Sequence, residues 1–152
     1  MRSERVRKSP AKGVVLVPDQ PTIVFLTVCS KNRQPWISQR IVQEMLLETW
    51  SRARAWMVGD YLLMPDHLHL FCSPNDPAFT IEQWLVCWKR EFTRRRLSDE
   101  WGWQRNSFHH RLRDSHEYAE KSHYVLENPV RLGLVKSPED WPFRGRINNL
   151  GW

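Results

Sequence analysis

The sequence predicts an α+β fold in which an antiparallel sheet carries helices on one face. Segments 22–29 and 67–73 are short, apolar runs of the kind that favours strands. Segments 38–54 and 80–97 instead carry apolar residues at a helical period. Strand-like and helical segments thus alternate along a chain of 152 residues, a length that fits one domain with a proper core.

The first half of the chain is expected to hold a strand, a helix and a strand pair. After the strand at 22–29, Ser38 can cap a helix that runs to about Arg54. The apolar stripe of this helix consists of Ile41, Met45, Leu46 and Trp50. A second strand at 56–64 ends in the turn residues Pro65-Asp66, and the strand at 67–73 should pair with it in antiparallel orientation.

The second half repeats the helix and strand and adds a helix. Thr80 can cap a second helix that reaches about Leu97, and a weakly alternating strand follows at 108–112. Asp114 or Ser115 can cap a third helix that ends before Pro129, and the remaining tail should fold back over the sheet. This order of elements is the ferredoxin-like split βαβ arrangement with an added C-terminal helix.

The composition indicates a soluble protein with an excess of positive charge. The chain is 41% hydrophobic and 26% charged, and it carries 23 Lys and Arg against 17 Asp and Glu. Such a surplus suggests an anionic partner, most commonly nucleic acid. The three cysteines show no C-x-x-C spacing, and no apolar run reaches membrane-spanning length. We therefore expect a cytoplasmic protein that does not bind membranes.

Positive charge is concentrated in two segments. Residues 1–12 read as a flexible basic arm, ahead of a single domain at 13–152, and residues 89–113 carry a further surplus. The predicted DNA contacts in these segments are Arg2, Arg5, Arg7, Lys8, Lys89, Arg90, Arg94, Arg95, Arg96 and Arg105. A solvated helix end explains the arginines at 94–96 equally well. Trp101 and Trp103 could stack on an unpaired base, although packing in the protein is the more common role.

Two histidines lie two residues apart in the strand predicted at 67–73. Side chains alternate across a strand, so His67 and His69 should project from one face while Leu68 and Leu70 enter a core on the other. Two imidazoles can supply two ligands to one metal ion if other groups complete the site. Strand histidines are also common as hydrogen-bonded or surface residues, so the pair alone does not decide between these roles.

The third predicted helix offers a reactive phenol and an amide. Tyr124 and Asn128 lie four residues apart, which places them on one helical face. A phenol can act as a covalent nucleophile, and an amide oxygen can bind a hard divalent ion. Packing of the tyrosine and a helix stop at Asn128-Pro129 are the plainer alternatives. Tyr118 is a rival nucleophile but lies about 120° away on the helix and has no asparagine at the same offset.

Taken together, two motifs carry a resemblance to a known family. Met-Pro-Asp-His-Leu-His-Leu-Phe at 64–71, followed by Tyr-Val-Leu-Glu-Asn-Pro-Val-Arg-Leu-Gly-Leu-Val at 124–135, closely resembles the REP-associated tyrosine transposases. These enzymes belong to the HUH superfamily and are related to single-strand insertion-sequence transposases. The resemblance extends from the first strand to the Asp-Trp-Pro-Phe segment at 140–143. Val125 and Glu127 stand where hydrophobic or aromatic residues are frequent in the family, which concerns helix packing.

The resemblance implies a site and an activity. It implies that His67, His69 and Asn128 bind Mg²⁺ or Mn²⁺ and that Tyr124, on the added catalytic helix, is the nucleophile. Imidazole ligands favour Mn²⁺ of these two ions. The implied enzyme is a metal-dependent single-stranded DNA endonuclease and strand transferase, a transposase, which acts at hairpin-forming DNA through a 5′-phosphotyrosine intermediate.

Several alternatives remain open beside this reading. The fold could serve a hairpin or single-stranded DNA-binding protein that does not cleave. The chain could also be a replication initiator or relaxase of the same superfamily. A further alternative is a hydrolytic metalloprotein that uses the histidines without the tyrosine. The chain could act as a monomer or a homodimer.

Overall fold

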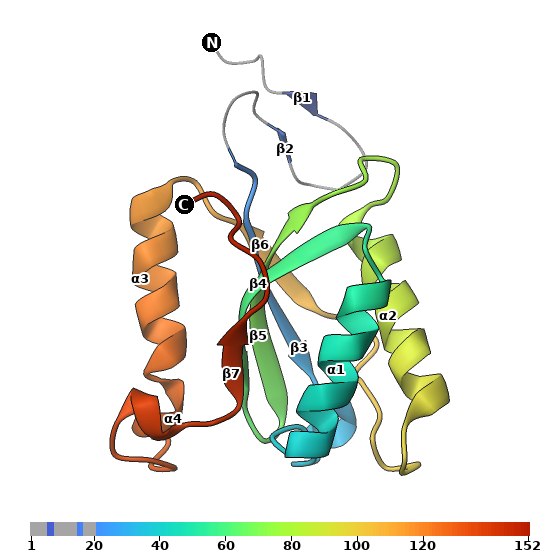
Figure 1. The fold of residues 1–152 in the computed structure, drawn as a ribbon, viewed down its shortest axis with the longest axis vertical. Coiled ribbons are helices and arrows are strands. Elements are labelled where there is room, and N and C mark those ends of the chain that lie inside the picture. Colours follow the sequence, from blue (N-terminus) through green and yellow to red (C-terminus); the bar gives the residue numbers. More distant parts are fainter. Residues whose placement is uncertain (1–5, 8–14, 17–20) are drawn as a thin grey trace.

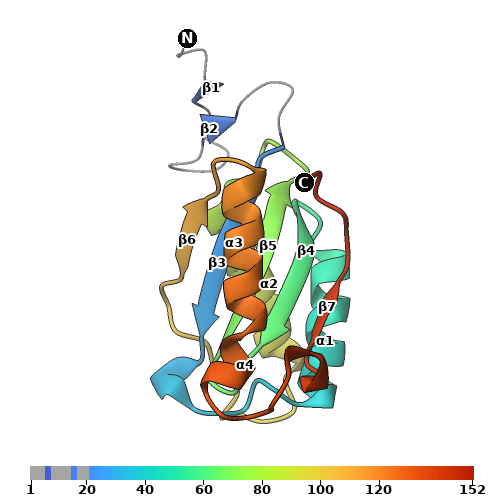
Figure 2. The same ribbon diagram turned by 90° about the vertical axis from the view of Figure 1, so that its left-hand side faces the viewer.

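The computed structural model describes residues 6–7, 15–16 and 21–152, and its centre is a five-stranded antiparallel sheet. The strands lie in the order β6-β3-β5-β4-β7, which Figure 2 shows from the side of the third helix. Their bounds are β3 Val24–Cys29, β4 Trp56–Leu63, β5 His67–Pro74, β6 Phe108–Arg111 and β7 Arg144–Arg146. Two further strands, β1 Val6–Arg7 and β2 Val15–Leu16, form a separate antiparallel pair.

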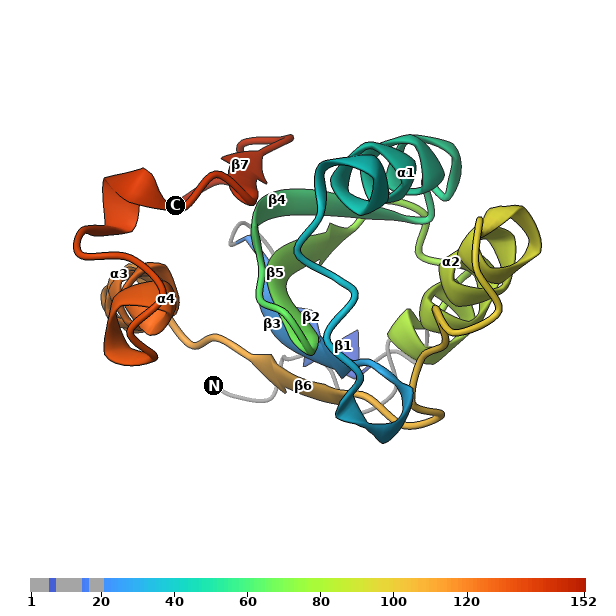
Figure 3. The ribbon, with the colours of Figure 1, turned by 90° about the horizontal axis from the view of Figure 1, so that it is seen from below.

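The helices cover both faces of the sheet. Helices α1 (Arg40–Arg52) and α2 (Ile81–Arg95) lie on one face, while α3 (Ser115–Leu126) and the short α4 (Asn128–Arg131) lie on the other (Figures 1 and 3). Two 3₁₀ turns, η1 (Lys31–Arg33) and η2 (Pro138–Asp140), complete the described elements. The predicted split βαβ order with an added C-terminal helix is confirmed, and β7 extends the sheet by pairing with β4.

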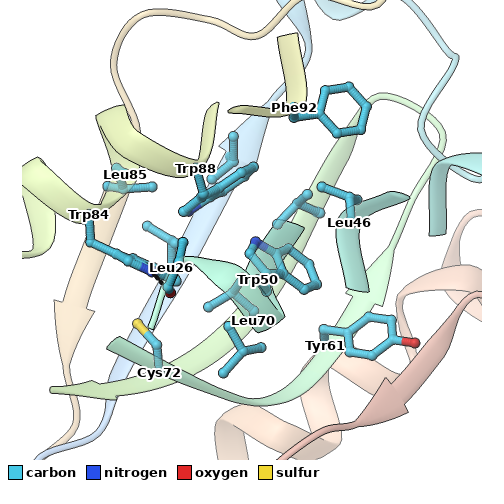
Figure 4. Close-up of a cluster of buried hydrophobic side chains, with 14 of the residues drawn as sticks. Leu26, Leu46, Trp50, Tyr61, Leu70, Cys72, Trp84, Leu85, Trp88 and Phe92 are labelled. Atoms are coloured by element: carbon cyan, nitrogen blue, oxygen red, sulfur yellow. Dashed lines mark hydrogen bonds between the residues drawn. The ribbon is translucent and has the colours of Figure 1, made fainter. Parts of the chain in front are cut away.

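The larger core lies between the sheet and the first two helices. Figure 4 shows Trp50, Trp84 and Trp88 packed over Leu26 and Leu70. Leu68 and Leu70 are fully buried on this face, as predicted. Helix α2 begins with a capping box, in which the Thr80 hydroxyl accepts from the Gln83 amide and the Gln83 side chain accepts from the Thr80 amide. These contacts fix α1 and α2 against one side of the strand that carries the histidines.

A second core holds α3 against the opposite face. Phe25 and Phe71 from the sheet pack with Val125 of α3 and with Trp141 of the C-terminal tail. The Trp141 indole donates a hydrogen bond to the Leu63 carbonyl at 2.9 Å. The tail therefore folds back over the sheet, as the sequence predicts, and helps to seat α3 beside β5.

The start of α1 differs from the prediction. The helix begins at Arg40 with Gln39 at its N-cap, because the Ile37 amide donates to the Pro65 carbonyl at 3.0 Å and holds the preceding chain in a non-helical path. Ser38 is therefore not the cap. The buried stripe consists of Val42, Leu46, Thr49 and Trp50, while Ile41 is 40% exposed. The true stripe keeps the i, i+4, i+7, i+8 spacing of one helical face.

Most of the predicted basic arm lies outside the described residues. This applies to Arg2, Arg5 and Lys8, and only the backbone of Arg7 is described, in β1. Among the described helices, none is long and apolar enough to cross a membrane.

Candidate active site

The two histidines of β5 lie side by side on the sheet face that α3 covers. In the antiparallel register of β3 and β5, His69 pairs with Thr27 and His67 with Cys29. The two imidazole ring centroids are 4.8 Å apart. The predicted common face is confirmed, but His69 is only 8% exposed and does not stand open, because the Phe25 ring stacks on it at 5.1 Å.

One ring nitrogen of each histidine is engaged by the protein. His67 Nδ1 lies 2.8 Å from the Asp66 carboxylate, and His69 Nδ1 lies 2.9 Å from the Thr27 hydroxyl. Burial raises the pKa of Asp66, but the hydrogen bonds from His67 and Arg33 outweigh it and leave that pKa below its ordinary value. When the partner accepts a hydrogen bond from Nδ1–H, Nε2 carries the lone pair, which is the usual arrangement for metal-binding histidines.

The environment of His69 keeps its imidazole neutral. Burial lowers its pKa from 6.5 to about 3, and the positive charges of His67, Lys121 and Arg131 act in the same direction. A neutral imidazole retains the lone pair that a metal ion requires. The chemistry of the histidine pair therefore fits a divalent cation with nitrogen ligands.

The lowered pKa of His69 predicts that the fold loses stability in acid. Because the unfolded chain binds this proton below about pH 6.5 and the folded chain only near pH 3, stability falls as the pH drops between these values. From pH 7 to pH 5 we expect a loss of about 2 kcal/mol from this residue. Urea unfolding in EDTA should show that loss in the wild type and a smaller one in His69→Gln. An equal loss in both proteins would contradict the prediction.

Tyr124 projects from the last turn of α3 and lies beside two cationic side chains. Its side chain is 53% exposed. The Arg131 guanidinium lies 4.0 Å from the centroid of the phenol ring, and the Lys121 ammonium lies 5.9 Å from it. Positive charge at these positions attracts a DNA phosphate.

Arg131 also links the tyrosine to the predicted amide ligand. It donates to the Tyr124 carbonyl at 2.8 Å and to Asn128 Oδ1 at 2.9 Å. Tyr124 and Asn128 do not share one helix, because α3 ends at Leu126 and Asn128 begins α4. An amide oxygen has two lone pairs, so Asn128 Oδ1 keeps one for a cation.

Lys121 connects the helix to the histidine face. Its ammonium lies 5.1 Å from the Phe25 ring centroid, and Phe25 stacks on His69. The ammonium of Lys121 thus lies near both the Tyr124 ring and the Phe25 ring that stacks on His69. The sequence analysis does not identify three residues of this site, Lys121, Arg131 and Thr27. The spacing of Lys121, three residues before Tyr124, indicates that the two side chains share a helical face.

Tyr118 makes a structural contact within the protein. Its hydroxyl donates to the Asp60 carboxylate at 2.9 Å, and its ring packs against Phe71. Burial and the nearby Asp60 charge raise the pKa of Tyr118 to about 12. A phenol that is held neutral and bonded to a carboxylate is a poor nucleophile, so the geometry favours Tyr124.

The predicted metal ligand set consists of two histidines and an amide. In the part of the chain that the structure describes, no group of three or more His, Cys, Asp and Glu side chains could hold a metal ion. The third ligand of the predicted set is accordingly of another residue type, the amide of Asn128. Asn128 Oδ1 accepts a hydrogen bond from Arg131, and its assignment as the third ligand stays a prediction.

The predicted DNA-contacting residues of α2 lie on the opposite side of the sheet from α3. Arg94 pairs with Glu91 at 2.7 Å, and Arg95 pairs with Glu48 at 2.7 Å. Arg96 donates to the Trp101 carbonyl at 3.3 Å. The ion pairs of Arg94 and Arg95 agree with a solvated helix end. Arg90 and Arg105 are exposed. DNA contacts by all of them stay predictions.

Lys89, Trp101 and Trp103 serve the fold. The Lys89 ammonium donates to the Ser107 hydroxyl at 2.7 Å and to the Gln104 carbonyl at 3.1 Å. Burial lowers its pKa to about 8. Trp101 and Trp103 both pack on Trp36, with ring centroids 5.7 and 4.8 Å away. The packing role of these tryptophans is therefore confirmed, and Lys89 is the weakest of the predicted phosphate contacts.

Fold and site together define an α+β protein in which a histidine pair lies on the sheet face covered by a tyrosine-bearing helix.

No family model matches the chain. A REP-associated tyrosine transposase of Escherichia coli (strain K12) is 25% identical over 123 residues, which are 78% of this chain and 73% of that protein. A protein of Haemophilus influenzae named "Putative REP-associated tyrosine transposase" is 32% identical over 96 residues, about half of each chain.

A solved structure of a REP-associated tyrosine transposase bound to a REP hairpin shares the fold. It aligns with a TM-score of 0.69 at 21% identity and covers 91% of this chain and 80% of its own. The chain is thus similar to REP-associated tyrosine transposases in sequence and shares its fold with one of them, which confirms the resemblance predicted from the two motifs.

Proposed function

We propose that this protein is a metal-dependent single-stranded DNA endonuclease and strand transferase that acts at hairpin-forming DNA. The observation that carries the proposal is the placement of Lys121, which lies over the Phe25 ring beside His69 and also near the Tyr124 ring. A candidate nucleophile, a phosphate-binding cation and two metal-type ligands therefore meet at one sheet face. Homology to transposases supports the same activity.

Tyr124 is the nucleophile in this mechanism. Its phenolic oxygen forms a bond to phosphorus, and the bond from phosphorus to the 3′ oxygen of the neighbouring nucleotide breaks. The phenol gives up its proton to solvent, and the departing 3′ oxygen takes up a proton to become a hydroxyl. The product is a 5′-phosphotyrosine link, which a second 3′-OH can attack to reseal a strand without ATP.

The neighbouring side chains orient these reacting groups. Arg131 holds the Tyr124 ring by stacking on it and fixes the Asn128 amide. Lys121 is placed to bind an oxygen of the scissile phosphate. His67, His69 and Asn128 would hold Mg²⁺ or Mn²⁺, which would withdraw charge from the phosphate.

The test is incubation with hairpin oligonucleotides that carry single-stranded flanks from the DNA around the gene. Labelled DNA, protein and either Mn²⁺ or EDTA are analysed on a denaturing gel. A metal-dependent covalent adduct supports the proposal. Tight hairpin binding without adduct or cleavage, over a panel of flanks, would favour a non-cleaving DNA-binding protein instead. A hydrolytic metalloprotein would cleave without an adduct.

Lys121→Met is expected to slow adduct formation by about a hundredfold, the usual effect of removing one preorganised donor from developing charge. Lys136→Met removes an exposed lysine elsewhere and should leave the rate unchanged. Single-turnover rates at saturating DNA would measure the effect. Equal rates in both variants would show that Lys121 takes no part in the reaction.

A further inference from the structure

A second candidate binding site lies on the other side of the sheet from the histidines. It is a pocket of about 810 Å³ between the residues that follow α1, the loop at 74–79 and the first half of α2. Its lining includes Arg54, Phe79, Val86, Cys87 and Arg90. Because α2 and α3 cover opposite faces of the sheet (Figure 3), this pocket is separate from the site of Tyr124.

The pocket displays apolar side chains on a fixed backbone. Phe79 is 44% exposed and Val86 is 55% exposed. The Phe79 carbonyl accepts from the Trp56 indole at 3.2 Å, and the Phe79 amide donates to the Asp76 carbonyl at 3.1 Å. An exposed aromatic ring on an anchored backbone is suited to stacking against a flat ligand.

The rim of the pocket is cationic. Arg54 and Arg90 are exposed, and neither has an ion pair within the described part of the chain. Two acidic side chains also line the pocket, but both have partners, since Glu82 lies 3.3 Å from His109 and Asp76 accepts from the Ala78 amide at 3.0 Å. Unpaired guanidinium groups beside an apolar surface suit a ligand that combines an aromatic ring with anionic groups.

We propose that this pocket binds an unpaired nucleotide of single-stranded DNA. The base lies against Phe79 and Val86, and the flanking phosphates pair with Arg54 and Arg90. A duplex presents only its backbone to such a surface, whereas an unpaired base can reach the apolar floor. The proposal goes beyond the proposed function, because the pocket takes no part in the cleavage chemistry and can be tested without it.

Cys87 provides a direct probe of occupancy. It lines the pocket and is exposed, whereas Cys72 is buried. Tyr124→Phe protein in EDTA would be treated with N-ethylmaleimide. Peptide mass spectrometry would then measure the extent of modification at Cys87 over time. We expect alkylation to be at least about fivefold slower with a hairpin-free oligonucleotide of about 12 nucleotides than with an abasic strand of equal length. Equal protection by both strands, or none from bound DNA, would overturn the proposal.

Variants distinguish binding in the pocket from general electrostatic attraction between the protein and DNA. The double variant Arg54→Ala/Arg90→Ala and the single variant Val86→Glu should each bind the oligonucleotide about tenfold more weakly. The double variant Arg113→Ala/Lys136→Ala also removes two charges, but away from the pocket, and should bind more tightly than either. Equal weakening in this control would show that only net charge matters. If the wild-type protein formed no DNA adduct while DNA still protected Cys87, the proposed function would be refuted and the proposal for the pocket would stand.

Discussion

Replacing Tyr124 with phenylalanine is expected to abolish the covalent protein–DNA adduct, with a loss of at least about a thousandfold in its rate of formation. The substitution removes only the attacking oxygen. The ring that stacks against Arg131 remains, and the half-exposed position has no buried partner to lose. The measurement is adduct formation on a denaturing gel with labelled hairpin DNA and Mn²⁺. Thermal unfolding should show wild-type stability.

Tyr118→Phe is the matched control for this experiment. It removes a phenol from the same helix, and with it the hydrogen bond to Asp60. We expect a loss of about 1 kcal/mol in the free energy of unfolding and an adduct rate close to that of the wild type. An adduct that survived in Tyr124→Phe and vanished in Tyr118→Phe would reverse the assignment. Cleavage that persisted in Tyr124→Phe without an adduct would identify water as the nucleophile.

The sequence predicts the strands and helices because their local signals agree with the tertiary structure. Thr80 and Gln83 form the capping box of α2 within one turn, so the start of that helix can be read directly. The start of α1 depends instead on the bond between the Ile37 amide and the Pro65 carbonyl, residues far apart in the chain. A long-range contact of this kind overrides the local preference of Ser38 for the cap.

The site could be predicted only in part for the same reason. The common face of His67 and His69 follows from strand alternation alone. The burial of His69 depends on the register that brings Phe25 and Thr27 of β3 beside it, which no local pattern encodes. Charge counting also selected Lys89 as a DNA contact, because a sequence gives the number of cations but not the direction in which each one points.

His67→Ala should lower the affinity for Mn²⁺ by at least about a hundredfold, because removal of a metal ligand exceeds the ten- to hundredfold effect usual for its supporting residues. His67 is the better position for this test than His69. Its side chain is 15% exposed, whereas His69 packs under Phe25 and its truncation would leave a cavity. Calorimetric titration with Mn²⁺ in the Tyr124→Phe background, with hairpin DNA present, measures binding without cleavage.

Asp66→Asn distinguishes a metal site from a merely structural histidine pair. Asp66 touches His67 Nδ1 and would support the ligand without binding the ion. We expect Mn²⁺ affinity to fall by about tenfold in this variant, between the wild type and His67→Ala. If neither variant changed the affinity, the metal would bind away from β5. If Mn²⁺ affinity instead decreased stepwise from the wild type to Asp66→Asn and then to His67→Ala, the cation would bind at His67, whose ring the Asp66 carboxylate orients. The metal would then lie on the sheet face where Lys121 is close to Tyr124.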